Sequence, residues 1–154
     1  MSNDSGVILV VDDEPLEVDL IRRILTGAGF RVIDADRYDS ALREFEESQS
    51  QIHLVLVDVS LPGKNGVELA KQLVKRKPGL RVLFVSGHVG LEVIRFYGMQ
   101  TTDQHFLQKP FRSETLLERV RQILKSSELA PWKDSDLGDG NGDESNGEAV
   151  KAGE

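Results

Sequence analysis

Short runs of apolar residues recur along the chain, with longer segments between them. Runs without polar alternation are typical of strands that are covered on both faces of a parallel sheet. Four runs have this character, and HFLQ at 105–108 is a weaker fifth. Each gap between runs is long enough for a crossover helix. The four stronger runs are VILVV at 7–11, RVIDA at 31–35, LVLV at 54–57 and VLFV at 82–85.

The segments between the runs predict helices. Pro15 favours a helix start, and Gly27 and Gly29 favour its end before the second strand. A second helix is expected to begin near Asp39 or Ser40, because either side chain can cap it. The sequence therefore predicts a helix after each of the first two strands.

Later segments continue the alternation. A third helix is expected to end at Pro78-Gly79, and the last to begin at Ser113. The stretch 90–104 is poorly periodic and predicts only a short fourth helix, from about Leu91 to Tyr97, followed by a loop. The apolar stripes are Leu20, Ile21, Ile24, Leu25 and Ala28; Ala41, Leu42 and Phe45; Val67, Ala70, Leu73 and Val74; and Leu116, Leu117, Val120, Ile123 and Leu124.

Strict alternation of strand and helix predicts an α/β fold. Right-handed crossovers then favour a doubly wound five-stranded parallel sheet with helices on both faces, in the flavodoxin-like strand order 2-1-3-4-5. We expect this domain to cover residues 6–127, with a disordered segment at 1–5. Residues 128–154 are rich in Gly, Asp, Asn, Ser and Glu and predict a disordered acidic tail.

Charge is unevenly distributed along the 154 residues, which carry a net charge of -7. Residues 1–127 hold 18 acidic and 17 basic side chains, whereas residues 128–154 hold 8 and 2. Neither part has a basic stripe, so we expect no direct binding to nucleic acid. The cluster Lys75-Arg76-Lys77 is interpreted as cations that complement the dipole at a helix C-terminus.

The chain contains no cysteine, so disulfides and thiolate metal sites are excluded. The first residues, MSNDSG, carry no basic segment typical of a signal peptide. The apolar runs are far shorter than the ~20 residues that span a bilayer. We therefore expect a soluble cytoplasmic protein whose chemistry uses oxygen and nitrogen groups.

Polar side chains follow four of the expected strands. Asp12 and Asp13 follow the first, Asp58 the third, Ser86 the fourth and Lys109 the fifth. In such a sheet, ligands bind beyond the carboxyl ends of the strands, so these groups are expected at one rim. Neighbouring carboxylates repel one another unless a cation joins them, and Mg²⁺ prefers oxygen ligands.

Each of these residues also has a plain structural interpretation. Asp13 alone can be the N-cap of the first helix. Ser86 with Gly87 can form an ordinary turn, and Lys109 before Pro110 can be a solvated loop residue. The combination of all of them at one rim favours the functional interpretation.

Four motifs carry a family resemblance, in the order VVDDEP, VDVSLPGKNG, VSGH and HFLQKPF. With them, the chain from Gly6 to about Ser127 resembles a response-regulator receiver (CheY-like) domain, the phosphoacceptor module of two-component signalling. The pair SGH and HFLQKPF further resembles receivers of bacterial hybrid sensor histidine kinases.

The resemblance implies roles for the acidic residues. Asp58 would be the phosphoacceptor, taking a phosphoryl group from the phosphohistidine of a sensor histidine kinase or a histidine phosphotransfer protein. Asp12, Asp13, Asp58 and the backbone carbonyl of Ser60 would bind Mg²⁺. The protein would signal to a downstream protein target and would not be an enzyme beyond its own phosphorylation and dephosphorylation.

The resemblance also assigns residues at the other strand ends. Lys109 would pair with Asp58 and then with the phosphoryl oxygens, and its bond to Pro110 would be cis. Ser86 would donate a hydrogen bond to the attached phosphoryl group, and Gly87 would leave space for it. Phe106 occupies the aromatic switch position, whose rotation accompanies the movement of Ser86.

Two alternatives remain. The first is a binding module of receiver fold that works without phosphorylation, although the presence of all the site residues argues against it. The second is a haloacid-dehalogenase-type phosphatase, in which the nucleophile and a second Asp stand two residues apart after the first strand; here Asp12 and Asp13 are adjacent. The residues after Ser127 are too few for an output domain, so we expect either a stand-alone receiver or one cut from a larger kinase. The starting Met1 and the polar tail slightly favour the stand-alone receiver.

Overall fold

The computed structural model describes residues 6–61, 64–87 and 105–126. Within these ranges, five parallel strands form one sheet in the order β2-β1-β3-β4-β5, which confirms the predicted fold class and strand order. The first two strands have the predicted bounds, and the third and fourth are slightly longer than predicted. The strands are β1 (Val7–Val11), β2 (Arg31–Ala35), β3 (Ile52–Asp58), β4 (Arg81–Ser86) and β5 (Phe106–Gln108).

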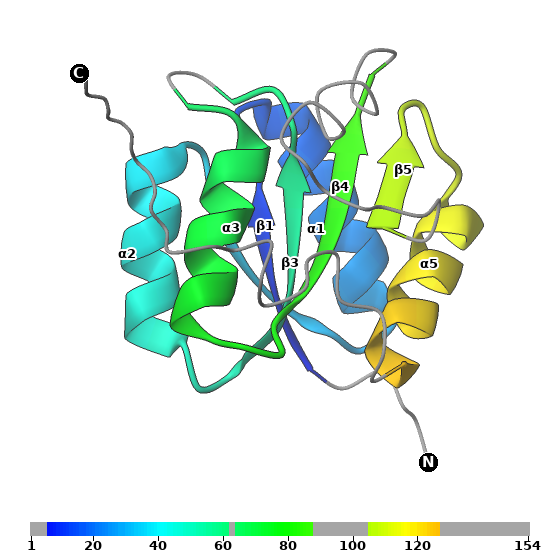
Figure 1. Ribbon diagram of the computed structural model, residues 1–154. Helices are drawn as coiled ribbons and strands as arrows, with labels where there is room; N and C mark the ends of the chain where they lie inside the picture. Colours follow the sequence, from blue (N-terminus) through cyan, green and yellow to red (C-terminus); the bar gives the residue numbers. More distant parts are fainter. Residues whose placement is uncertain (1–5, 62–63, 88–104, 127–154) are drawn as a thin grey trace, which may run out of the picture.

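Helices cover both faces of the sheet. In Figure 1, α2 and α3 lie on one face, and α1 and α5 lie on the other. The short helix expected at 91–97 lies outside the described residues, as do the segments 1–5 and 128–154. The helices are α1 (Pro15–Gly27), α2 (Tyr38–Ser48), α3 (Gly66–Arg76) and α5 (Ser113–Lys125).

Alternate residues of the central strands contribute to two separate cores. In β1, Val7, Leu9 and Val11 pack on the α2–α3 side, whereas Ile8 and Val10 pack on the α1–α5 side. Because every residue of this strand is buried, its sequence is a continuous apolar run. The two cores explain why apolar runs, and not alternating patterns, identified the sheet.

The first helix departs from the predicted stripe at one position. Ile21 and Leu25 are buried as expected, but Leu20 is 49% exposed. Leu20 precedes Ile21 by one residue, and therefore by about 100° around the helix, so it falls at the edge of the buried face. As predicted, the helix ends at Gly27, and Gly29 follows with a φ of 108°, a conformation that favours glycine.

The second helix begins earlier than predicted. It starts at Tyr38 with Arg37 in the N-cap position, so neither Asp39 nor Ser40 is the cap residue. The Ser40 hydroxyl instead lies inside the first turn and accepts a hydrogen bond from the Arg37 backbone N–H at 3.2 Å. Ser40 therefore predicted the first turn of the helix correctly, but the N-cap residue is Arg37.

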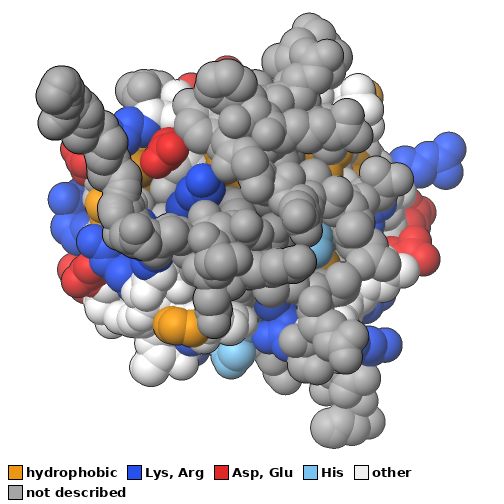
Figure 2. Space-filling model, viewed as in Figure 1, with side chains coloured by type: hydrophobic (Ala, Val, Ile, Leu, Met, Phe, Trp, Pro, Cys, Tyr) orange, Lys and Arg blue, Asp and Glu red, His pale blue; other side chains and the backbone are white. Residues whose placement is uncertain are grey.

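Charged side chains on the α2–α3 side are mixed in sign. Lys75 and Arg76 lie in the last turn of α3, as the sequence predicts. Arg76 pairs with Glu46 of α2 at 2.9 Å. Figure 2 shows basic and acidic side chains next to each other over these helices. None of the described helices has the length and apolar character required to cross a membrane.

Candidate functional site

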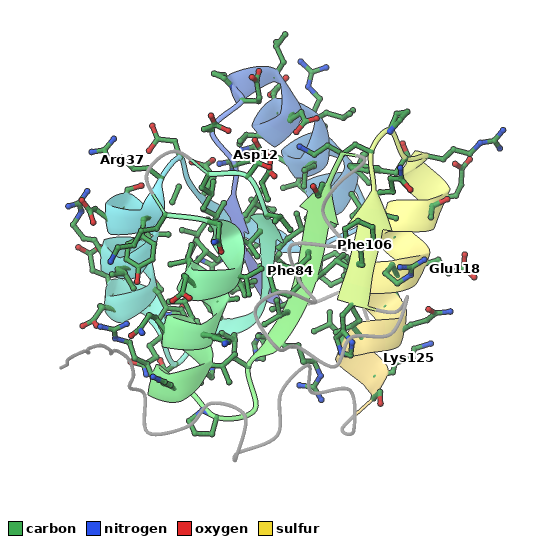
Figure 3. The ribbon with its side chains drawn as sticks, turned by 45° about the horizontal axis from the view of Figure 1, so that its top comes forward. Asp12, Arg37, Phe84, Phe106, Glu118 and Lys125 are labelled. Atoms are coloured by element: carbon green, nitrogen blue, oxygen red, sulfur yellow. The ribbon has the colours of Figure 1, made fainter. Side chains whose placement is uncertain are left out.

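The carboxyl ends of β1, β3, β4 and β5 lie along the same edge of the sheet (Figure 1). Asp12 directly follows β1, Asp58 is the last residue of β3 and Ser86 is the last residue of β4. All three are buried polar residues. Figure 3 places Asp12 at this edge, directly after β1. The structure therefore brings these sequence-predicted residues to one rim.

Asp58 is held at both carboxylate oxygens. Its Oδ1 accepts a hydrogen bond from the backbone N–H of Ser60 at 2.8 Å. Its Oδ2 accepts one from Lys109 Nζ at 2.9 Å. The residue is buried, with 6% of its surface exposed, and these two hydrogen bonds fix the orientation of its carboxylate. Such an oxygen is suited to attack an electrophile that approaches from solvent.

Lys109 is positioned by the end of the sheet. Its backbone N–H donates to the carbonyl oxygen of Ser86 at 2.7 Å, and the Lys109-Pro110 peptide bond is cis, as predicted. The ammonium group contacts Asp58, Asp12 at 3.5 Å, and Glu17. Burial lowers the pKa of Lys109, but the hydrogen bonds with Asp58 and Glu17 outweigh burial and raise it, so this group is a permanent cation.

Asp12 and Glu17 share a proton-sensitive contact. Burial, followed by the hydrogen bond with Glu17, raises the pKa of Asp12 to about 7. Burial also raises the pKa of Glu17, but its hydrogen bonds with Asp12 and Lys109 outweigh this and lower it. Asp12 therefore holds a proton more readily than an ordinary aspartate, and Glu17 holds one less readily than an ordinary glutamate.

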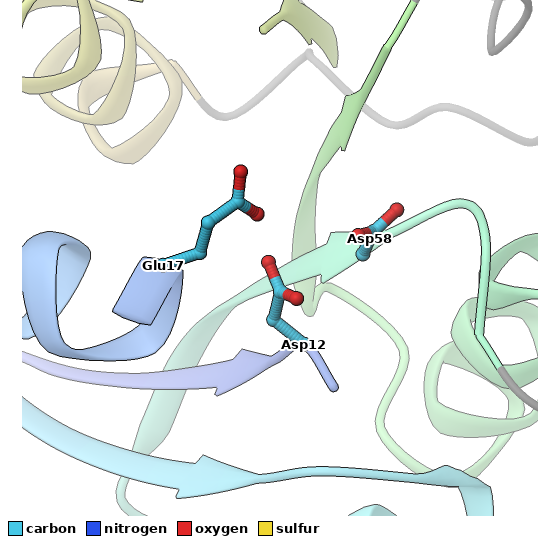
Figure 4. Close-up of side chains that lie close together, drawn as sticks. All are labelled: Asp12, Glu17 and Asp58. Carbon is cyan, nitrogen blue, oxygen red and sulfur yellow. The ribbon is translucent and has the colours of Figure 1, made fainter. Parts of the chain in front are cut away.

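Three carboxylates surround a common point at the rim. Asp12, Glu17 and Asp58 each offer an oxygen atom, and these atoms lie within 4.8 Å of one another (Figure 4). Hard oxygen donors at this spacing fit a small divalent cation such as Mg²⁺. Glu17 was missed by sequence reasoning; its signal is an acidic residue in the first turn of the helix that follows Asp12 and Asp13.

Asp13 differs from Asp12 in burial. It is exposed, and it is not one of the three residues grouped around the cation position. Both Asp12 and Asp13 line a groove of about 570 Å³, together with residues of α1, β2 and α2. The alternative interpretation of Asp13 as a helix cap is wrong, because Glu14 occupies the N-cap position and its backbone N–H donates to Asp12 Oδ1 at 2.9 Å.

Ser86 and Phe106 lie on neighbouring strands. Ser86 is 1% exposed and pairs with Gln108, and Phe106 pairs with Phe84 of β4 (Figure 3). Phe106 is only partly buried and packs against the α2–α3 core. A Cβ atom at Gly87 would meet no atom of the described residues within 4 Å.

Gly66 is a further residue that sequence reasoning missed. It begins α3, and a Cβ atom there would lie 2.1 Å from the carbonyl oxygen of Asp58. Its N–H donates to Val59 at 2.8 Å, and Asn65 caps the helix by accepting from the Glu68 N–H at 3.0 Å. The start of α3 therefore packs directly against the backbone that carries Asp58.

Comparison with known proteins supports a single family. The family model for the response regulator receiver domain matches residues 8–121. The transcriptional regulatory protein CpxR of Escherichia coli strain K12 is 33% identical over 135 residues, which are 88% of this chain and 55% of CpxR. The chain thus spans about half the length of the curated relatives it matches.

Solved structures agree with this assignment. A response regulator receiver protein from Sinorhizobium medicae WSM419 is 27% identical with a TM-score of 0.71, and the match covers 82% of this chain and 100% of that one. The receiver domain of the hybrid histidine kinase CckA is 31% identical with a TM-score of 0.62, covering 78% of this chain and 100% of that one.

Proposed function

The chain belongs to the family of response regulator receiver domains, and on this premise we propose that Asp58 accepts a phosphoryl group from a phosphohistidine on a partner protein. An oxygen of the Asp58 carboxylate forms a new bond to phosphorus, and the phosphorus–nitrogen bond of the donor breaks. The electron pair of that bond stays on the imidazole nitrogen, and one proton on the ring makes the leaving group neutral histidine. The product on Asp58 is an acyl phosphate.

The contact between Lys109 and Asp58 is the observation that carries this proposal. A buried carboxylate that is held at 2.9 Å by a permanent cation has a positive partner already beside the oxygen that attacks. Phosphoryl transfer requires mainly an in-line arrangement and neutralisation of the phosphoryl oxygens, and little covalent chemistry from the protein. Lys109 supplies part of that neutralisation.

A bound divalent cation would supply the rest of the neutralisation. We assign Asp12, Asp13, Asp58 and the backbone carbonyl of Ser60 as the residues that hold Mg²⁺, and the oxygen cluster of Asp12, Glu17 and Asp58 supports a cation at this position. When bound, Mg²⁺ neutralises charge on the transferring phosphoryl oxygens. Asp58 and Lys109 remain the groups of this chain that take and orient the phosphoryl group.

The phosphoryl group then acts as a signal. Ser86 donates a hydrogen bond to the phosphoryl group, and Phe106 on the neighbouring strand rotates inward as Ser86 moves. The new anion thereby shifts the protein surface near these residues from one of two conformations to the other. The partners are a sensor histidine kinase or a histidine phosphotransfer protein upstream, and a protein target downstream. The chain is a signalling module and catalyses only its own phosphorylation and dephosphorylation.

Intact-mass measurement tests the proposal. The protein is incubated with Mg²⁺ and acetyl phosphate, a small acyl phosphate donor, and a species about 80 Da heavier is expected. Asp58→Ala is the matched variant and should remain unmodified. Absence of the heavier species in the wild type, or an equal amount in Asp58→Ala, would contradict the proposal and favour a binding module that works without phosphorylation.

A further inference from the structure

Glu17 is the one carboxylate of the oxygen cluster that is not among the residues we assign to hold Mg²⁺. It lies in the first turn of α1, where an acidic residue is favourable for the helix dipole alone. Glu68 is the corresponding residue in the first turn of α3. The carboxylate of Glu17 differs because it contacts Lys109, which is 92 positions away in the sequence. A local role in α1 does not require this contact.

The Lys109 ammonium group is shared among three carboxylates. Its Nζ donates hydrogen bonds to Asp58 and Glu17 and forms a longer ion pair with Asp12 at 3.5 Å. A phosphoryl group on Asp58 needs a donor from the same ammonium group. Turning the ammonium group toward the phosphoryl group therefore weakens at least one of its present contacts.

Glu17 is the partner that can leave most easily. Its side chain is 35% exposed, whereas the side chains of Asp12 and Asp58 are 1% and 7% exposed. Figure 4 shows Glu17 reaching toward Asp12 from the start of a helix, while Asp12 and Asp58 project from strand ends. A flexible glutamate at a helix start can rotate into water, but a buried carboxylate at a strand end cannot.

We propose that Glu17 is a positioning residue that holds the Lys109 ammonium group in the unphosphorylated site and competes with the phosphoryl group for it. The inference rests on the proposed function, because it concerns the same phosphoryl transfer to Asp58. Glu17 also adds a negative charge beside the path of an anionic donor. Both effects slow the gain of the phosphoryl group and shorten its stay.

The test compares Glu17→Gln with the wild type and with Glu68→Gln. Glu68 is a matched control because it occupies the same helical turn in α3, where its charge acts on Tyr38. Phosphorylation by acetyl phosphate is followed over a series of Mg²⁺ concentrations, and the rates are compared at the plateau. In this reaction a bond from Asp58 to phosphorus forms, and the donor's phosphorus–oxygen bond breaks to release acetate.

Glu17→Gln should be phosphorylated about two- to tenfold faster at the plateau, the range given by loss of one hydrogen bond. Its phosphoryl group should also persist longer, and Glu68→Gln should match the wild type. Lysine side-chain NMR of the metal-free protein provides a readout independent of the reaction. The ammonium signal that is missing in Lys109→Arg should exchange faster with water in Glu17→Gln than in the wild type.

Each contrary outcome has a distinct meaning. If the wild type is not phosphorylated, the proposed function is wrong. If the wild type is phosphorylated and Glu17→Gln has the same plateau rate and the same ammonium exchange, the inference about Glu17 is overturned. A folded Glu17→Gln that binds Mg²⁺ poorly and reacts more slowly at every Mg²⁺ concentration would also overturn it, because Glu17 would then be a required cation ligand.

Discussion

Asp12 is a buried acid whose charge depends on its neighbours. Its pKa is raised to about 7, by burial first and then by the hydrogen bond with Glu17. A carboxyl group with a raised pKa in the folded protein binds a proton more readily there than in the unfolded chain. The folded state is therefore penalised as the pH rises from the unfolded pKa of about 3.8 to the folded value of about 7.

This sign gives a prediction for the metal-free protein. Asp12→Asn should raise the free energy of unfolding by on the order of 1–3 kcal/mol at pH 8, and the gain should shrink as the pH falls toward 4. Chemical denaturation without Mg²⁺ at several pH values measures it. Asp13→Asn is the control, because Asp13 is exposed and its change should have little effect. A gain in the free energy of unfolding that does not vary with pH would contradict the raised pKa of Asp12.

Some residues at the rim could be predicted from the sequence, and others could not. Asp12, Asp58, Ser86 and Lys109 could be identified because each directly follows an apolar run, and the ends of parallel strands share one edge. Glu17 could not, because its contact depends on the length and direction of its side chain and on Lys109, 92 positions away. The exposure of Asp13 beside the buried Asp12 likewise depends on the turn between β1 and α1.

At the scale of elements, the start of α3 is fitted to the end of β3. A Cβ atom at Gly66 would lie 2.1 Å from the Asp58 carbonyl oxygen and 2.9 Å from the Val57 side chain. No side chain fits at such distances without moving the backbone that carries Asp58. The glycine therefore positions Asp58 through packing.

Gly66→Ala should lower the free energy of unfolding by about 1–3 kcal/mol or more, because it overpacks a closed contact. Gly27→Ala is the matched control, since a Cβ atom at the end of α1 would meet no described atom within 4 Å. Alanine there should be neutral or stabilising by up to about 1 kcal/mol. Denaturant unfolding of both variants measures the difference. If both variants changed the free energy of unfolding equally, the contact between Gly66 and the Asp58 backbone would not be rigid.

Element bounds illustrate a second limit of sequence reasoning. The bounds of β1 and the end of α1 could be predicted because an unbroken apolar run and two glycines define them. The start of α2 could not, because Ser40 accepts a hydrogen bond from inside the first turn instead of capping it. Leu20 lies at the edge of a buried stripe, where packing decides exposure.

At the scale of the whole molecule, two cores share one sheet. Phe45 of α2 lies in the core on one face, and Leu25 of α1 in the core on the other. The central strands contribute alternate residues to both, so neither core persists when the other is lost. The rim that carries the site depends on this shared sheet.

Phe45→Ala and Leu25→Ala should each lower the free energy of unfolding by about 2–5 kcal/mol, because both side chains are fully buried. Each variant should still unfold in a single transition. Circular dichroism and the NMR signals of methyl groups on the opposite face should report the same midpoint. Loss of one face before the other would show that the two cores are independent.

The central claim is that Asp58 is the phosphoacceptor, and residue-level mapping tests it most directly. After incubation with Mg²⁺ and acetyl phosphate, borohydride reduction converts an aspartyl phosphate to homoserine, which peptide mass spectrometry can locate. We predict homoserine at position 58 in the wild type when both Mg²⁺ and the donor are present, and none when either is omitted. Unchanged Asp58 in a sample whose intact mass shows phosphorylation, or homoserine at another position, would contradict the account.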